Sequence, residues 1–392
     1  MSVALQEIQI KEEVIKWRRY LHMYPELSYE EEKSSHFVYK KLLSFGNLEV
    51  SKPIKNSVIA KLKGNKPGRT IALRADMDAL PITEETNVDF ASKNTGVMHA
   101  CGHDGHMAML LGAAKILSQN QDKITGEIVF IFQHAEEQFP GGAKELVESG
   151  VLDGVDEIIG LHLMPMIDVG KIGITYGPAM AASDTFTLII KGKGGHAAIP
   201  QNSVDSIAIA AQIVSNLQYI ISRNVDPLET VVISITQFVA ESAINVIPEQ
   251  VKMGGSVRSF NPELRKKLPA MLEKVIKGIT EAHGAAFEFN YHYGYSPVIN
   301  TDAVTKMIHE TAVEVVGEDS VERMKPLMTG EDFSAYLEKT AGCFFFVGVR
   351  NESKGIVHPL HHPQFAIDED SLDIGMNILV NTAIKLLNEK PV

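Results

Sequence analysis

The stretch 98–106 contains three histidines, a cysteine and an aspartate within nine residues. Cys101 and His103 are two residues apart, so in an extended segment their side chains project from the same face. A thiolate and an imidazole on one face make half of a zinc-type site. Apolar residues at helical spacing follow directly, so this group lies where a loop enters a helix. Taken alone, the spacing fits a metal site and a merely polar helix start equally well.

Further ionisable residues follow predicted strands elsewhere in the chain. They are Asp76, Asp78, His134, Glu136, Glu137, His162, His358, His361 and His362. Open α/β sheets bind their ligands at the carboxyl ends of the strands, so we expect these side chains to converge with those of 98–106. Considered separately, the aspartate pair also fits an Asx turn or a helix cap, and the glutamate pair fits a solvated acidic loop.

The number of these residues indicates two metal ions. A single structural zinc takes four ligands and closes, whereas a catalytic site must keep a position open for water. More ligands are available here than one tetrahedral ion can use, so two ions bridged by a ligand or by water fit better. The adjacent Glu136 and Glu137 indicate a division of labour, in which one carboxylate binds metal and its neighbour moves a proton from water to a leaving amine.

Composition limits the class of protein. The length of 392 residues predicts about two domains. The net charge of -12 argues against nucleic acid or an anionic membrane as the main partner. The two cysteines indicate no disulfide framework, so we expect a cytoplasmic protein. We also see no signal peptide and no apolar run long enough to span a bilayer.

Strands and helices alternate through most of the chain and predict a doubly wound, mixed-sheet α/β catalytic domain. Pro25 ends a first helix, and Ser28 begins a second one with Glu31 as its capping-box partner. Later helices are expected at 105–118, 143–149, 301–316 and 370–388, and strands at 58–62, 70–74, 126–133, 158–162 and 342–348.

The pattern changes near residue 183. Strand, helix, two strands, helix and strand then follow in the ferredoxin-like order, up to residue 293. We therefore predict a metal-binding catalytic domain made of 1–182 and 294–392, with 183–293 inserted as an α+β lid and dimerisation domain. Because strands of the insert could present an open edge, we expect a homodimer or a homotetramer.

Motifs from residue 18 to residue 363 match a known family. They are Arg18–Ser28, Leu73–Ile82, His99–His106, His134–Glu137, Gly160–His162, Gly192–Ala198, Ile244–Pro248, Gly255–Phe260, Gly330–Phe333 and Leu360–Pro363. The chain resembles the amidohydrolase branch of the zinc aminoacylase and carboxypeptidase-like metallopeptidases. This branch includes hippurate hydrolases, N-acyl-amino-acid amidohydrolases, N-acetyldiaminopimelate deacetylases and auxin-conjugate hydrolases.

The resemblance implies a role for each matched residue. The implied metal ligands are Cys101, His103, Glu137, His162 and His361. Glu136 is the implied general base, and Asp78 orients a ligand imidazole. His196 is implied to reach over the scissile carbonyl, usually from the partner subunit, while Asn245, Arg258 and Gly330 contact the substrate.

Three positions depart from the family pattern. Asp76 stands where exopeptidase relatives carry a metal-binding histidine, so we expect Cys101 to compensate. His362 stands where relatives have Ser or Asn, which leaves open whether His361 or His362 binds metal. Ala366 replaces a common aspartate. For His22, His99, His106 and His134 we expect local packing or hydrogen bonds, and for Cys343 an inert buried thiol.

The implied reaction is hydrolysis of the amide bond of an N-acyl-L-amino acid, with two divalent ions of zinc, manganese, cobalt or nickel. Two other readings stay open. One is a dipeptidase or carboxypeptidase with the same metals and a peptide substrate. The other is a non-catalytic, metal-dependent binding protein.

Overall fold

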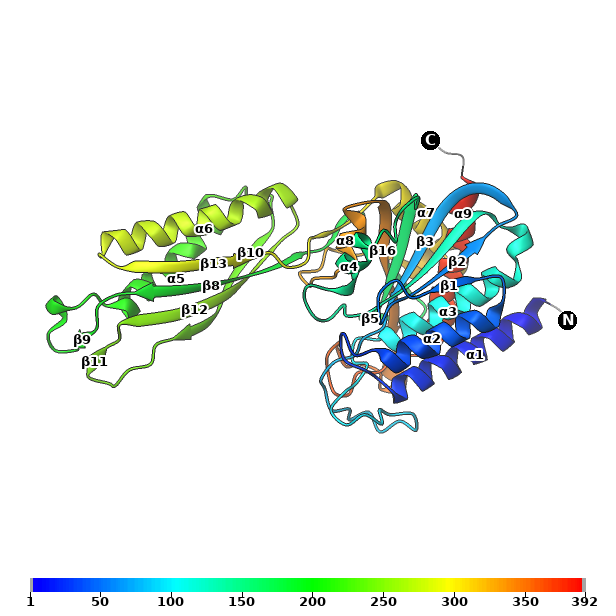
Figure 1. The fold of residues 1–392 in the computed structure, drawn as a ribbon, viewed down its shortest axis with the longest axis horizontal. Coiled ribbons are helices and arrows are strands. Elements are labelled where there is room, and N and C mark those ends of the chain that lie inside the picture. Colours follow the sequence, from blue (N-terminus) through cyan, green and yellow to red (C-terminus); the bar gives the residue numbers. More distant parts are fainter. Residues whose placement is uncertain (1–2, 390–392) are drawn as a thin grey trace. The chain divides into compact units, whose positions relative to one another are not determined.

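The computed structural model describes residues 3–389, and side chains from residue 10 onward. The chain forms two compact units. The first consists of Met1–Ala179, Ile299–Lys325 and Asp332–Val392, and the second of Met180–Val298 and Pro326–Glu331 (Figure 1). The predicted α/β class with a large mixed sheet is confirmed.

The first unit is built on an eight-stranded sheet in the order β1-β2-β4-β3-β5-β16-β6-β15. Its strands are β1 (Glu49–Ser51), β2 (Val58–Lys63), β3 (Lys66–Asp76), β4 (Thr125–Gln133), β5 (Glu157–Asp168), β6 (Ile172–Ile174), β15 (Val321–Arg323) and β16 (Ala341–Arg350). The central strands β4, β3, β5 and β16 are parallel. They are buried and apolar along most of their length, as expected for parallel strands covered on both faces.

Helices cover this sheet and close its core. They are α1 (Val3–Met23), α2 (Glu32–Phe45), α3 (His103–Gln119), α4 (Gly142–Glu148), α7 (Asp302–Val316), α8 (Ser334–Leu337) and α9 (Asp370–Asn388). Helices α3 and α9 pack on β3, α7 packs on β16, and α1 and α2 lie outside α3 (Figure 1). Short 3-10 turns complete this part of the chain at Gln121–Lys123, Glu318–Ser320 and Glu352–Lys354.

Strand register places the predicted site residues at one edge of the sheet. Asp76 at the end of β3 pairs with Gln133 at the end of β4. The last pair between β3 and β5 joins Arg74 to Gly160, and His162 follows two residues later. Because these strands are parallel, the ends that carry Asp76 and His162 lie at the same level of the sheet.

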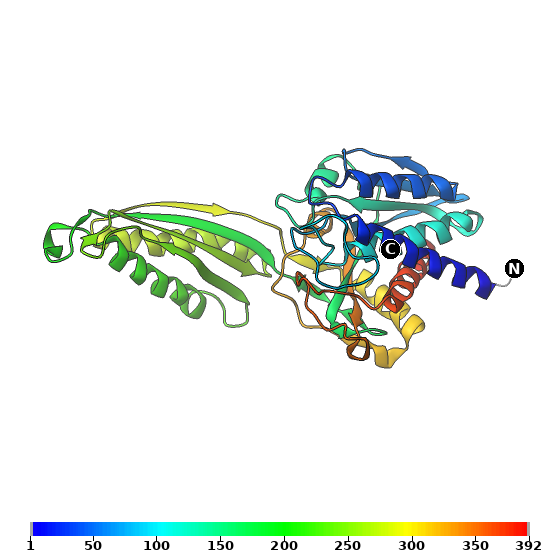
Figure 2. The same ribbon diagram turned by 90° about the horizontal axis from the view of Figure 1, so that it is seen from below.

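The second unit is a four-stranded antiparallel sheet in the order β10-β12-β8-β13. Its elements are β8 (Ala182–Lys191), α5 (Ser206–Arg223), β10 (Val231–Val239), β12 (Gln250–Ser259), α6 (Pro262–Ala282) and β13 (Ala286–His292). Both helices pack against the sheet and each other (Figure 2). Together with the sheet they bury an apolar core. Asp205 and Asn261 cap the two helices by accepting backbone N–H groups.

Two short strand pairs and one short turn accompany these sheets. The antiparallel pair β9 (Gly195–His196) and β11 (Val246–Ile247) belongs to the second unit, as does the 3-10 turn Pro200–Asn202. Strands β7 (Gly177–Met180) and β14 (Val298–Asn300) pair where the chain passes from one unit to the other. The segment Pro326–Glu331 joins the second unit because Ala181 N donates to the carbonyls of Leu327 and Thr329.

Two local predictions were wrong. Helix α2 begins at Glu32, and neither Ser28 nor Glu31 forms a capping box. Instead, the carboxylate of Glu26 accepts the N–H groups of Lys33 and Ser34 in the first turn. The pair Cys101 and His103 is not extended either, because α3 already begins at His103. Gly102 turns the chain with a positive φ of 89°.

Candidate metal centre

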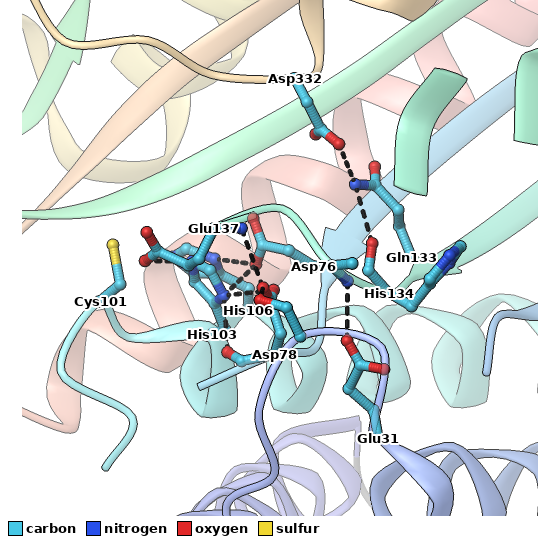
Figure 3. A network of polar contacts seen from close by, with 12 residues as sticks. Glu31, Asp76, Asp78, Cys101, His103, His106, Gln133, His134, Glu137 and Asp332 are labelled. Carbon is cyan, nitrogen blue, oxygen red and sulfur yellow. Dashed lines mark hydrogen bonds and ion pairs between the residues drawn. The ribbon is translucent and has the colours of Figure 1, made fainter. Parts of the chain in front are cut away.

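The described part of the first unit brings metal-ligating side chains together at the ends of β3, β4 and β5. The ligand atoms of Cys101, His103 and His162 lie within 4.8 Å of one another. The same holds for Cys101, Glu137 and His361, and for His103, Glu136 and Glu137. These overlapping groups share Cys101, His103 and Glu137, so they form one continuous cluster (Figure 3).

Hydrogen bonds fix the orientation of two histidine rings in the cluster. Nδ1 of His103 lies 2.9 Å from the carbonyl oxygen of Asp78 and 3.2 Å from its Oδ1. Nδ1 of His162 lies 2.7 Å from the carbonyl oxygen of Leu163. Because each Nδ1 faces only acceptors, it carries the proton. In the neutral form of each ring, the lone pair of Nε2 is therefore available for a metal ion.

The two Nε2 atoms point at groups that bind cations. His162 Nε2 lies 3.3 Å from Cys101 Sγ, and His103 Nε2 lies 3.9 Å from Glu137 Oε1. Within the described residues, the buried His103 Nε2 has no hydrogen-bond partner. This nitrogen lies beside a thiol and a carboxylate. Together the three groups form a donor set that suits a divalent cation.

The electrostatics of the cluster also favour a cation. Burial and the nearby Glu137 and Glu136 raise the pKa of the Cys101 thiol well above its usual range. Burial lowers the pKa of His103, but surrounding carboxylates, Asp76 foremost, outweigh it and raise that pKa to about 10. Burial lowers the pKa of His162, which keeps that ring neutral. The cluster therefore concentrates negative charge that a bound cation would offset.

Asp76 and His106 form a further convergent group with His103, but protein hydrogen bonds already engage both residues. His106 Nδ1 is 2.6 Å from Asp76 Oδ1, and its Nε2 accepts the backbone N–H of Leu163 at 2.9 Å. The other oxygen of Asp76 accepts from the buried Arg74 at 2.7 Å. Both ring nitrogens of His106 are thus engaged, and Asp76 is held in an ion pair.

The turn that carries Glu136 and Glu137 is held from several sides. Asp78 Oδ2 accepts the N–H of Glu137 at 2.9 Å and the hydroxyl of Ser28 at 2.7 Å. His134 lies 2.7 Å from Ser57 Oγ through Nδ1 and 3.3 Å from Glu145 Oε2 through Nε2. This local bonding agrees with the role expected for His134.

Of the two adjacent histidines His361 and His362, His361 faces the cluster. Its Nε2 lies 3.3 Å from Glu137 Oε1, and its backbone N–H donates to the carbonyl of Ala100. The ring of His362 stacks on His358 with centroids 4.4 Å apart. Among the described residues, His362 belongs to none of the convergent groups.

His196 and Asn245 lie side by side in the second unit. His196 pairs with Val246 across the short strands, and Ala197 N donates to the carbonyl of Asn245 at 2.9 Å. Nδ1 of His196 accepts the N–H of Ala198 at 3.1 Å, which leaves Nε2 as the protonated nitrogen. The side chain of His196 is exposed, so this N–H can donate to a substrate.

Arg258 and Gly330 meet around Ser183, also in the second unit. Arg258 pairs with Ser183 across β12 and β8, and a Cβ at Gly330 would lie 2.8 Å from Ser183 Oγ. The same Cβ would lie 3.5 Å from Arg258 Nη1, an ordinary van der Waals contact, so a side chain at position 330 would first crowd Ser183. No carboxylate among the described residues forms an ion pair with Arg258, which suits it to bind an anion.

Sequence reasoning missed the residues that support the cluster. Arg74, Ser57 and Glu31 were given no role in it. Ser57 and Glu31 contact the site through residues distant in sequence, whereas Arg74 contacts Asp76 two residues away. The matched stretches gave a signal at two places: Leu73–Ile82 contains Arg74, and Arg18–Ser28 ends at Ser28, whose hydroxyl contacts Asp78.

Comparison with known proteins gives a consistent result. The model of peptidase family M20/M25/M40 matches residues 72–385. An N-acyl-L-amino acid amidohydrolase of Geobacillus stearothermophilus is 61% identical over 294 residues, which are 75% of this chain and 80% of that protein. Thermostable carboxypeptidase 1 of Saccharolobus solfataricus is 40% identical over 97% of both chains.

A solved structure shares the whole fold. The Bacillus subtilis YXEP protein, described as a dinuclear metal binding peptidase, superposes with a TM-score of 0.86. It is 37% identical, and the match covers 97% of this chain and 99% of that one. Separately, none of the described helices combines the length and the apolar character that a membrane crossing requires.

Proposed function

The chain belongs to peptidase family M20/M25/M40, and from this premise we propose that it hydrolyses the amide bond of N-acyl-L-amino acids. It is an enzyme that acts on amides. The observation that carries the substrate class is the 61% identity to an N-acyl-L-amino acid amidohydrolase, over three quarters of the chain. The convergent cluster around Cys101 and His103 supports a metal-dependent reaction.

We assign the metal ligands to Cys101, His103, Glu137, His162 and His361, for two divalent ions per chain. Zinc, manganese, cobalt and nickel suit such donors, and the Cys101 thiolate favours zinc or a similarly borderline ion. When bound, such ions lower the pKa of a water molecule and polarise a carbonyl group. Asp78 supports this role by holding the Nδ1–H of His103.

Glu136 is the proposed general base. It is buried beside Glu137 and His103, and its carboxylate lies in a convergent group with both. In the reaction it takes a proton from the water that attacks the amide carbon. It then gives this proton to the nitrogen of the departing amino acid. The products are the carboxylic acid of the acyl group and the free amino acid, and Glu136 returns to its starting state.

The second unit supplies the proposed substrate contacts. The Nε2–H of His196 donates to the carbonyl oxygen as negative charge develops on it. Asn245, whose carbonyl accepts the N–H of Ala197, lies directly before β11 and contacts the substrate beside His196. Arg258 binds the α-carboxylate of the amino acid through two N–H groups, and Gly330 leaves room for that approach.

A carboxypeptidase is the second candidate, because a relative with that name is 40% identical over nearly the whole chain. The experiment that separates them measures metal per chain together with release of free amino acid from N-acetyl, N-benzoyl and dipeptide substrates, with and without chelator. Close to two metals and chelator-sensitive release from the acyl substrates would support the proposal. Faster release from dipeptides would favour the carboxypeptidase. Bound metal without any release would favour a binding protein.

We further propose a cytoplasmic homodimer or homotetramer. Both cysteines of the chain, Cys101 and Cys343, are free and buried, which suits a reducing compartment. The second unit ends its sheet in the edge strands β10 and β13, and an edge strand can pair with another copy. Residues 183–293 are therefore the proposed lid and dimerisation domain.

A further inference from the structure

Glu31 is a fully buried carboxylate that belongs to none of the metal-ligating groups of the described chain. Its two oxygens accept hydrogen bonds from three donors. Oε1 lies 3.0 Å from the N of Tyr29 and 2.7 Å from the N of Ala135, and Oε2 lies 3.0 Å from Nδ2 of Asn56. Glu31 directly precedes α2, and Figure 3 shows its side chain beside the turn that follows β4. Glu31 thereby ties the segment before α2 to the turn that carries Glu136.

The backbone at Ala135 needs such support. Its φ is +50°, in the left-handed region that a residue with a Cβ rarely adopts. Ala135 directly precedes Glu136 and Glu137. Its backbone conformation therefore sets the direction in which these two side chains point after the end of β4. A turn with this backbone persists only where surrounding contacts hold it.

Two carboxylates hold the two amides on either side of Glu136. Glu31 accepts the N–H of Ala135, and Asp78 accepts the N–H of Glu137 at 2.9 Å. Glu136 is therefore placed between two fixed peptide groups. Asp78 also bonds His103, whereas the hydrogen bonds of Glu31 go to Tyr29, Asn56 and Ala135, none of which is a proposed metal ligand.

The buried position of Glu31 lowers the stability of the folded protein near neutral pH. Burial and the nearby charge of Asp78 raise the pKa of Glu31 to about 7. A buried carboxylate that resists ionisation weakens the folded state near neutral pH.

We propose that Glu31 is a positioning residue, which holds the Ala135 peptide so that Glu136 is aimed at the reacting groups. The proposal rests on the assignment of Glu136 as general base. Glu31 touches neither substrate nor metal. It acts on the rate through the conformation of the turn.

The test compares Glu31→Ala and Glu31→Gln in the metal-loaded enzyme. The alanine removes the acceptor of the Ala135 amide, so we expect kcat to fall by about 100-fold, because a misplacement of the order of 1 Å costs that much. KM and metal per chain should stay near the wild-type values. Glutamine keeps an acceptor oxygen, so it should restore most of kcat. Equal losses in both variants would refute positioning through this hydrogen bond.

Glu26→Ala is the matched control. Glu26 lies in the same segment and also accepts backbone amides, those of Lys33 and Ser34, but it does not contact the turn. We expect this variant to lose stability and keep kcat. A fall in kcat as large as that of Glu31→Ala would overturn the proposal, since disturbance of the segment alone would then explain both.

Amide hydrogen exchange gives a readout that does not depend on activity. Exchange in a peptide spanning 134–137 should accelerate in Glu31→Ala and stay slow in Glu31→Gln and Glu26→Ala. If the wild-type enzyme released no amino acid from any substrate, the proposed function would fail while this exchange pattern still showed the contact. Unchanged exchange in Glu31→Ala would refute the contact itself.

Discussion

The backbone N–H of Leu163 donates to Nε2 of His106, and the carbonyl of Leu163 accepts from Nδ1 of His162. One peptide unit on either side of Leu163 thus links His106 to a proposed metal ligand. His106 is in turn held by Asp76, which is held by Arg74. This series of hydrogen bonds orients His162 from a residue whose two ring nitrogens are both engaged by protein groups.

His106→Ala should therefore weaken metal binding without removing a ligand. Outer residues that orient a ligand typically contribute about 10- to 100-fold in metal affinity or activity. We expect a loss in that range, with both metals still bound at saturating concentration, whereas His103→Ala should lose metal at any practical concentration. Competition with a chromophoric chelator measures both variants. Equal losses would place His106 among the ligands instead.

Glu136→Gln should retain metal and lose turnover. Glutamine preserves the size of the side chain but cannot accept the proton of the attacking water, and general base catalysis is worth about 100- to 10,000-fold. Metal analysis and single-turnover kinetics on the same preparation measure the two effects. Turnover close to that of the wild type would refute the assignment of the base.

His196→Ala should reduce kcat far more than metal content. The side chain lies in the second unit, on β9, and its Nε2 is the nitrogen left for the substrate. Loss of one donor to a developing oxyanion costs about 100- to 1,000-fold in kcat. Parallel loss of metal and kcat would indicate a structural role. His292→Ala, an exposed histidine at the end of β13, serves as the control.

Arg265→Ala should destabilise the second unit strongly. Arg265 bonds both oxygens of the buried Asp184 and the carbonyl of Gly294. Removing it leaves a buried carboxylate without its cation, which costs about 3–5 kcal/mol. Lys266→Ala removes an exposed pair with Glu263 on the same helix and should change stability little. Denaturant unfolding compares the two, and similar midpoints would contradict the expectation.

The pKa of Glu31 predicts the sign of one pH effect on stability. The unfolded chain loses this proton near pH 4.5 and the folded chain near pH 7, so the folded state binds more protons between these values. Its free energy of unfolding therefore falls as the pH rises from 4.5 to 7, by at most about 3 kcal/mol from this group. Metal-free Glu31→Gln should lack that fall. Parallel pH profiles of the two proteins in denaturant unfolding would argue against it.

Much of the architecture was predictable from periodicity alone. Continuous apolar runs such as 128–132 and 343–347 are typical of strands buried on both faces, and the structure shows them as the buried strands β4 and β16. The change to alternating strands near residue 183 predicted the ferredoxin-like order found in the second unit. These patterns are local, and burial enforces them wherever the segment lies in the fold.

The capping box shows where local patterns fail. Ser28 and Glu31 have the spacing of a helix start, but Asp78 and Ala135 compete for the same side chains. Buried partners that are distant in sequence outweigh a solvent-exposed cap, because an unsatisfied buried amide costs more than an exposed one. The spacing carries no record of that competition.

The sequence by itself therefore determined the fold class and the set of side chains able to bind metal, since residue type decides which chemistry is available. Only the tertiary structure decided which of them converge. It directs Nε2 of His103 and His162 inward, engages both nitrogens of His106, and places His361 rather than His362 at Glu137. The choices at His103, His106 and His361 depend on hydrogen bonds between residues far apart in the chain, and such bonds exist only once the sheet has set its strands in register.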